Sequence, residues 1–182
     1  SYDRLLLYRK DFGGVLGAKS AWPILVYGLP SLTVRFTQQM KTAQLVAEFL
    51  EQDNRIGIVN YPGLESFHQR ALARAQMQNY DGDFAPGTMM YFIPKGKTPQ
   101  ERHRKANRLV NYIAGNSYTM TLAVSLGNIR TLIEHPASMT HSSIPPEEQL
   151  KRGIHPGGIR LSIGLEKAKD IIHDLEKALS MM

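Results

Sequence analysis

The sequence contains no cysteine, which excludes disulfides, thiolate metal sites and a cysteine nucleophile from this chain and fits a reducing compartment. No apolar run approaches the roughly 20 residues that a membrane-spanning helix needs. Glycine-rich phosphate loops and a Gly-x-Ser-x-Gly elbow are also missing. These absences argue against a membrane protein, a nucleotide-binding protein and a serine hydrolase, and we expect a cytoplasmic location.

What is present describes one globular core with an added arm. The chain has 182 residues, of which 42% are hydrophobic and 21% charged, and its net charge is +6. The densest basic cluster falls on a helical pattern whose apolar positions supply a buried stripe, and no aromatic residues are interleaved with it. We therefore interpret this cluster as a solvent-facing helix surface and expect no nucleic-acid partner. It consists of Arg102, His103, Arg104, Lys105 and Arg108.

The first part of the chain, residues 1–54, is expected to be an arm followed by a long kinked helix. The arm covers residues 1–17 and breaks at Gly13-Gly14. Helical periodicity covers residues 18–27 and 32–50, with an interruption at Gly28-Leu29-Pro30. The second helix repeats apolar residues at steps of three and four, and it is long enough to bridge two domains. That stripe is Leu32, Phe36, Met40, Ala43, Ala47 and Leu50.

Residues 55–182 alternate strand and helix patterns, which is typical of an α/β domain. Helices are predicted at 66–77, 99–115, 146–152 and 167–179, the second opened by a capping box from Thr98 to Glu101. Strands are predicted at 56–59, 89–93, 118–124 and 159–163. We expect a small, mostly antiparallel sheet of about four strands covered by helices.

One strand carries the most informative residue. Alternation along residues 159–163 places Ile159, Leu161 and Ile163 on one face and Arg160 with Ser162 on the other. A guanidinium takes a carboxylate through two parallel hydrogen bonds, and the two glycines just upstream, at 157 and 158, let backbone approach a ligand. An ordinary surface arginine at a strand end is the other interpretation of the local pattern.

A wider set of motifs resembles one enzyme family. These are Ser125-Leu126-Gly127, His135-Pro136-Ala137-Ser138-Met139-Thr140-His141, the Pro145-Pro146-Glu147-Glu148 turn and Ile159 to Glu166. They look like the C-terminal part of the pyridoxal-phosphate enzymes of cysteine and methionine metabolism, which include methionine gamma-lyase, cystathionine gamma-synthase and homoserine-ester sulfhydrylases. The resemblance covers nearly the whole chain and implies the C-terminal domain of a fold-type I enzyme.

The resemblance also implies roles for particular residues. Arg160 would hold the α-carboxylate of an amino-acid substrate, Ser125 and Leu126 would approach the same group, and Thr140 would lie nearby. Val124 stands where cystathionine enzymes of the family often carry glutamate, which favours a thioether or a homoserine ester over cystathionine. Glu134 stands where methionine gamma-lyase-like sequences often have glutamine, so Val124 and Glu134 are the candidate specificity residues.

Parts of the family pattern are missing. No lysine follows a Ser-x-Thr context, and Asp53-Asn54 runs into Arg55, unlike the Asp-Asn-Thr segment that pairs with the pyridine nitrogen. Because the chain also begins with Ser1, we expect it to be roughly the C-terminal half of a longer enzyme. Alone it should have no catalytic residue, retain no pyridoxal phosphate and turn over no substrate. Its expected partners are the amino acid, the missing N-terminal cofactor domain and further copies of the same protein.

Two alternatives remain. His135, His141 and His155 could suggest a metal, but no Asp or Cys completes a ligand set, so we expect no metal site. A non-catalytic binding or oligomerisation module that kept the family fold would also lack the lysine. The retained Ser125 and Arg160 favour the enzyme, since an assembly module has no use for a carboxylate site.

Overall fold

The computed structural model describes residues 2–182, and of Pro146 only the backbone. Ser1, which belongs to the expected arm, lies outside the described residues. The chain forms two compact units, one ending at Val34 and the other running from Arg35 to Met182. This division falls inside a helix, and the domain boundary expected at residues 54/55 stays a prediction.

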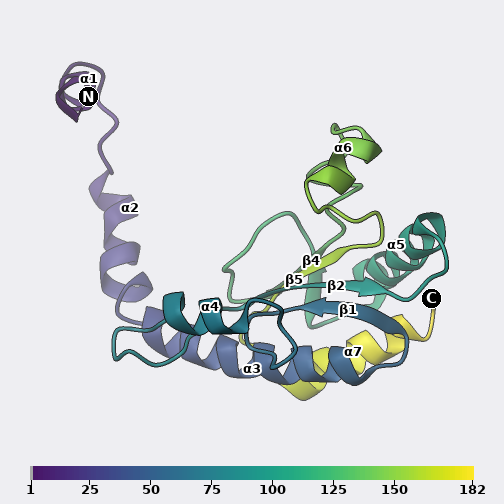
Figure 1. The fold of residues 1–182 in the computed structure, drawn as a ribbon. Helices are drawn as coiled ribbons and strands as arrows, with labels where there is room; N and C mark the ends of the chain where they lie inside the picture. The colour runs from purple at the N-terminus through teal and green to yellow at the C-terminus, as the bar shows by residue number, and fades with distance from the viewer. Residues whose placement is uncertain (1) are drawn as a thin grey trace. The chain divides into compact units, whose positions relative to one another are not determined.

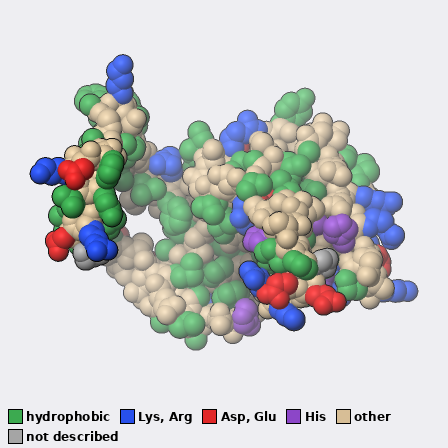
Figure 2. Space-filling model, turned by 90° about the horizontal axis from the view of Figure 1, so that it is seen from above, with side chains coloured by type: hydrophobic (Ala, Val, Ile, Leu, Met, Phe, Trp, Pro, Cys, Tyr) green, Lys and Arg blue, Asp and Glu red, His purple; other side chains and the backbone are tan. Residues whose placement is uncertain are grey.

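The first unit contains the helices α1 (Tyr2–Phe12), α2 (Ala18–Pro23) and the π-helix η1 (Ile24–Gly28). Gly13 and Gly14 have φ values of 84° and 83°, which explains the break after α1. Pro23 has no N–H to donate, and the helix continues past it with π-type bonds such as Leu29 N–H to the Ile24 carbonyl at 2.8 Å. None of the three helices contains a buried residue, and apolar side chains lie on their surface (Figure 2).

Helix α3 (Leu32–Gln52) joins the second unit and packs against its sheet only after its first turns. Ala43, Ala47 and Leu50 are fully buried, as the periodicity predicts. The expectation that the apolar stripe is buried along its whole length is wrong for its start, because Leu32 and Phe36 are 47% and 38% exposed. The helix therefore supplies the core with its second half.

The sheet has five strands in the order β1 (Ile56–Asn60), β2 (Met89–Pro94), β5 (Ile159–Ser162), β4 (Thr131–Glu134) and β3 (Met120–Leu122). All neighbouring pairs are antiparallel except β3 with β4. The mostly antiparallel α/β class is thus confirmed. The expected number of strands, about four, is corrected to five, because β4 is only four residues long and gives no alternation.

Helices α3, α5 (Pro99–Asn116) and α7 (Ala168–Leu179) share one hydrophobic core with the sheet. Figure 1 shows α3 and α7 on one side of the sheet and α6 (Pro146–Lys151) on the other. Ile159, Leu161 and Ile163 are fully buried in that core, so the predicted alternation of β5 is confirmed. Arg160 and Ser162 are thereby turned to the opposite face.

Two local expectations need correction. Helix α4 (Arg70–Gln76) begins later than residue 66, because residues 61–70 form successive turns that bond Leu64, Phe67 and Arg70 N–H groups three residues back. On α7, Asp174 accepts hydrogen bonds from the Ser117 and Thr119 hydroxyls at 2.6 and 2.8 Å.

The basic surface of α5 is likewise only partly solvated. The Arg102 guanidinium donates to the Gly96 carbonyl at 3.0 Å, and His103 Nδ1 lies 3.1 Å from the Pro156 carbonyl oxygen. These two side chains therefore fasten α5 to the loops beside it, while Arg104 and Arg108 are exposed.

Candidate functional site

Arg160 lies on the central strand of the sheet, between two residues of neighbouring strands. Its register partners are Tyr91 on β2 and Glu134 on β4. The three residues occupy the face opposite the helical core, because their neighbours Phe92, Ile133 and Leu161 belong to that core. The alternation that buries the aliphatic residues thus brings three polar side chains together.

Two contacts hold the Arg160 guanidinium. Its Nη1 lies 2.9 Å from Oε1 of Glu134, and its Nη2 donates to the Ser125 carbonyl oxygen at 2.9 Å. The side chain is 24% exposed, whereas that of Glu134 is 1% exposed. Arg160 is therefore a fixed cation that remains accessible from solvent.

Glu134 has an unusual environment for a carboxylate. Burial raises its pKa, while the charges of Arg160 and His141 and the Thr140 hydroxyl act in the opposite direction. Neither carboxylate oxygen accepts a hydrogen bond of good geometry from the described residues. Its ion pair with Arg160 is therefore its main stabilising contact.

The loop over residues 123–130 carries three of the predicted site residues. Ser125 contacts Arg160 through its backbone carbonyl. Val124 and Leu126 are 55% and 61% exposed, so their apolar side chains are available to a ligand. Thr140, on a separate exposed loop, has its hydroxyl 2.8 Å from Nδ1 of His141.

Two buried polar residues fix this loop. Sequence reasoning missed Gln39, and it placed Ser162 beside Arg160 without giving it a partner. The Gln39 side-chain amide on α3 donates to the carbonyls of Asn128 and Ile163, each at 2.9 Å. The Ser162 hydroxyl accepts a hydrogen bond from the Gly127 N–H at 3.1 Å. A signal for Gln39 existed, because it lies three residues after Phe36 and four before Ala43 on an apolar stripe.

Gln39→Leu should lower the free energy of unfolding by about 1–3 kcal/mol, because the Asn128 and Ile163 carbonyls lose their donor. Urea unfolding measures this loss. Gln38→Leu is the matched control, because Gln38 is the exposed neighbour on the same helix. Equal effects of the two variants would show that the amide does not fix the loop.

The glycines before β5 serve the protein's own packing. A Cβ on Gly157 would collide with Arg102 and one on Gly158 with the Tyr91 ring. The Tyr91 hydroxyl accepts from the His155 N–H at 3.1 Å. These glycines admit Arg102 and Tyr91 at close range, and the expected approach of their backbone to a ligand stays a prediction.

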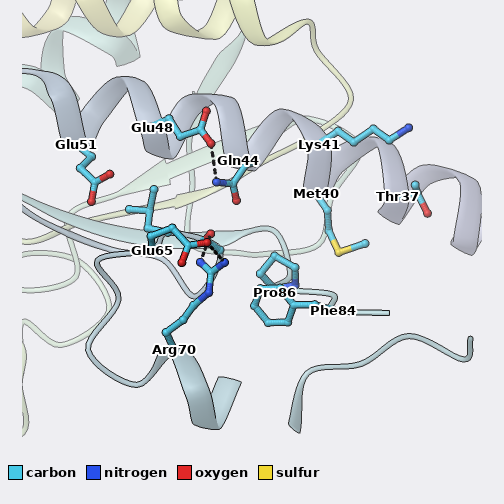
Figure 3. A pocket seen from close by; sticks show the side chains of 12 residues that line it. Thr37, Met40, Lys41, Gln44, Glu48, Glu51, Glu65, Arg70, Phe84 and Pro86 are labelled. Atoms are coloured by element: carbon cyan, nitrogen blue, oxygen red, sulfur yellow. Dashed lines mark hydrogen bonds and ion pairs between the residues drawn. The ribbon is translucent and has the colours of Figure 1, made fainter. Parts of the chain in front are cut away.

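A cavity of about 500 Å³ lies elsewhere, between α3 and the segment around α4 (Figure 3). Arg70 at its wall pairs with Glu65 and donates to the Gly63 carbonyl, and Gln44 donates to Glu48 at 2.7 Å. Lys41 lines this cavity, and Lys95, Lys97 and Lys105 line a second one beside the start of α5. Neither cavity includes Arg160, Glu134 or Ser125.

In residues 2–182, no group of three or more His, Cys, Asp or Glu side chains could hold a metal ion. His135 is fully buried, with Nδ1 2.7 Å from the Ser138 hydroxyl and Nε2 2.6 Å from the Pro156 carbonyl. Burial lowers the pKa of His135 and of His155. Across the same residues, no helix has the length and apolarity to cross a membrane.

Comparison with known proteins gives a consistent result. The family model of the Cys/Met metabolism PLP-dependent enzymes matches residues 2–180. An L-methionine gamma-lyase of Porphyromonas gingivalis is 43% identical over 155 residues, which are 85% of this chain and 35% of the relative.

Two solved structures have closely similar folds. The cystathionine gamma-lyase of Micromonospora echinospora has a TM-score of 0.81 and 34% identity over 98% of this chain and 43% of its own. A structure from Campylobacter jejuni, described as an O-acetylhomoserine (thiol)-lyase with a pyridoxyl-lysine phosphate, has a TM-score of 0.79 and 35% identity over 96% of this chain and 38% of its own. The chain therefore spans less than half the length of the relatives it matches.

Proposed function

Because the chain belongs to the family of Cys/Met metabolism PLP-dependent enzymes, we propose that it supplies the substrate α-carboxylate site of such an enzyme. The enzyme would act on sulfur amino acids or homoserine esters by γ-elimination or γ-replacement. The observation that carries the proposal is Arg160, a partly exposed guanidinium that Glu134 and the Ser125 carbonyl hold in one position. A fixed, accessible fork of N–H donors suits a carboxylate.

The role of the chain is then to orient the substrate. Pyridoxal phosphate, when bound, supplies the electron-sink chemistry of this family. No lysine of this chain follows a Ser-x-Thr context, and neither of the two lysine-lined cavities described above includes Arg160. Cofactor binding and the Schiff-base lysine are thus assigned to the rest of the enzyme. Arg160 would pin one end of the amino acid so that its other end points to the reacting groups.

The 123–130 loop supports an apolar or weakly polar substrate side chain. Val124 and Leu126 expose aliphatic groups close in sequence to Ser125, which contacts Arg160. A thioether or a homoserine ester suits such a surface better than the distal ammonium of cystathionine. Thr140 and Glu134 would complete the site from the other side of Arg160.

Val124→Glu in the holoenzyme should shift preference toward L-cystathionine, because the new carboxylate can pair with the distal ammonium. The loss on L-methionine or O-acetyl-L-homoserine should be the larger change, since a carboxylate without a partner is costly to desolvate. Competition assays with pairs of substrates measure the ratio. An unaltered ratio would show that this position does not set specificity.

A non-catalytic binding or oligomerisation module is the second candidate. The exposed apolar residues of the first unit favour it, among them Leu5, Phe12 and Trp22 at 67%, 84% and 63% exposure. Such surfaces also fit an oligomeric enzyme, so they do not separate the two functions. The candidate carboxylate site at Arg160 does separate the two functions, because a binding module has no use for it. For this reason we favour the enzyme.

Arg160→Lys in the holoenzyme tests the proposal. Lysine keeps the charge beside Glu134 but lacks the planar fork, so kcat/KM should fall about 10- to 100-fold for L-methionine, L-cystathionine and O-acetyl-L-homoserine alike. Arg152→Lys is the matched control, since Arg152 pairs with Glu148 on the surface at 58% exposure. Unchanged kinetics in the Arg160 variant would remove Arg160 from the substrate site.

A further inference from the structure

The buried carboxylate of Glu134 forms an ion pair with Arg160 across two neighbouring strands. It is 1% exposed, and Arg160 Nη1 lies 2.9 Å from its Oε1. Strand pairing sets this geometry, because Glu134 and Arg160 are direct register partners. Neither residue can move far from the other without breaking the β4–β5 ladder.

This arrangement gives Arg160 an internal counter-ion at the position proposed to receive a substrate carboxylate. An ionised carboxylate that is buried away from water needs a paired charge or hydrogen bonds to be stable. Glu134 has the pair with Arg160 but accepts no hydrogen bond of good geometry within the described part of the chain. Whatever weakens that pair therefore raises the pKa of Glu134 and favours its neutral form.

The other groups around the pair do not replace Arg160. His141 acts on Glu134 through its charge from the loop after β4, and the Thr140 hydroxyl lies near. Tyr91 on β2 faces Arg160, but burial raises its pKa and its hydroxyl accepts from the His155 N–H. His135 comes directly after Glu134, the last residue of β4, and its two ring nitrogens contact Ser138 and Pro156.

We propose that Glu134 is the ion-pair partner of Arg160 in the unliganded enzyme. When a substrate α-carboxylate pairs with Arg160 in its place, Glu134 takes up one proton. The proposal rests on the proposed function of Arg160 as the carboxylate site. In the exchange, the ionised pair plus one carboxylate plus one proton becomes a neutral Glu134 and a new pair between Arg160 and the ligand. One negative charge enters, one proton enters with it, and the net charge of the site stays zero.

The proton uptake determines how the affinity for a substrate carboxylate depends on pH. A second carboxylate beside Arg160 raises the pKa of Glu134 above its value in the free enzyme. Between these two pKa values, binding consumes a proton, so the carboxylate contributes less to affinity as pH rises. The contribution should fall by up to about tenfold per pH unit within that window.

A matched pair of ligands isolates this contribution. L-norleucine has no leaving group, and n-pentylamine is the same molecule without its carboxylate. The inhibition constants of both are measured on the holoenzyme from about pH 6 to about pH 9, and their ratio reports the carboxylate alone. In the wild type, norleucine should bind more tightly than pentylamine, and this difference in affinity should shrink as pH rises.

Glu134→Gln should make that ratio independent of pH, and above neutral pH norleucine should bind about tenfold or more tightly than it does to wild type. Glu176→Gln removes an exposed carboxylate on α7 and should leave the wild-type profile. His141→Asn should also keep the pH dependence, with its window moved to higher pH, because the charge of His141 no longer lowers the pKa of Glu134. A pH dependence that disappears with His141 and persists without Glu134 would overturn the proposal.

Calorimetry provides a test that needs no variant. Norleucine binding, compared with pentylamine binding in two buffers of different ionisation enthalpy, should take up about one additional proton within the window. Equal proton uptake by the two ligands would overturn the coupling. In one outcome, Arg160→Lys weakens the binding of norleucine and not that of pentylamine while both ligands take up the same number of protons. In that case the proposed function stands and only the role of Glu134 fails. If Arg160→Lys weakens neither ligand, the proposed function itself fails.

Discussion

Arg160→Ala is expected to lower the free energy of unfolding of the chain by about 3 kcal/mol at neutral pH, apart from any effect on substrate. Glu134 is 1% exposed and would be left beside no compensating charge. Removing one partner of a buried ion pair is more costly than the pair is stabilising, because an uncompensated charge remains. Urea unfolding at about pH 7 measures the change.

The double variant Arg160→Ala, Glu134→Gln is the control, and it should recover most of the lost stability because no buried charge remains. Lowering the pH should likewise restore stability to the Arg160→Ala single variant, because it neutralises Glu134. Without Arg160, burial raises the pKa of Glu134 further above its unfolded value, so the destabilisation grows as pH rises between those two values and fades below them. A single variant that is as unstable at about pH 4 as at about pH 7 would point to lost packing of the arginine stem instead.

The sequence predicted those parts of the fold that depend on local pattern. The alternation along β5 identified its buried face, and Thr98 at the start of α5 does accept a hydrogen bond from the Glu101 N–H at 3.1 Å. The Glu101 carboxylate, however, reaches back to the Lys97 N–H at 2.8 Å rather than to the N–H of Thr98. Local spacing thus specified the helix start and missed one of its partners.

What could not be predicted depends on contacts between distant segments. Strand β4 is four residues long and fully buried, so it lacks the period-two pattern that exposes one face. Gln39 bonds residues 89 and 124 positions away, and Asp174 bonds a loop that precedes it by more than 50 positions. Such partners follow from the register of the sheet and the docking of α3 and α7.

The candidate site shows the same division. Arg160 stood out from strand alternation and from the resemblance, and its use in substrate binding stays a prediction. Its ion pair with Glu134 required the β4–β5 register, and its bond to the Ser125 carbonyl required the course of the 123–130 loop. The sequence makes Glu134 a specificity candidate, whereas its burial beside Arg160 follows only from the packing of the sheet.

Gly164→Ala is expected to cost about 3 kcal/mol or more and to disturb the loop that carries Ser125. A Cβ at this position would collide with the backbone of Ile129 and Arg130 and with the Glu166 carboxylate, and backbone atoms cannot yield as a flexible side chain does. The same carboxylate accepts hydrogen bonds from the Thr131 N–H at 3.1 Å and hydroxyl at 2.7 Å, so the start of β4 would shift as well.

Gly115→Ala provides the matched control, because a Cβ at Gly115 meets nothing within 4 Å and the residue lies in the last turns of α5. Alanine should stabilise that helix by about 0.5–1 kcal/mol. Thermal and urea unfolding of both variants give the comparison, and NMR shifts of the Ser125 and Gly127 amides report the loop. If Gly164→Ala matched the control in stability and left those amides unmoved, the close approach of residues 129–130 to Gly164 would not constrain the loop.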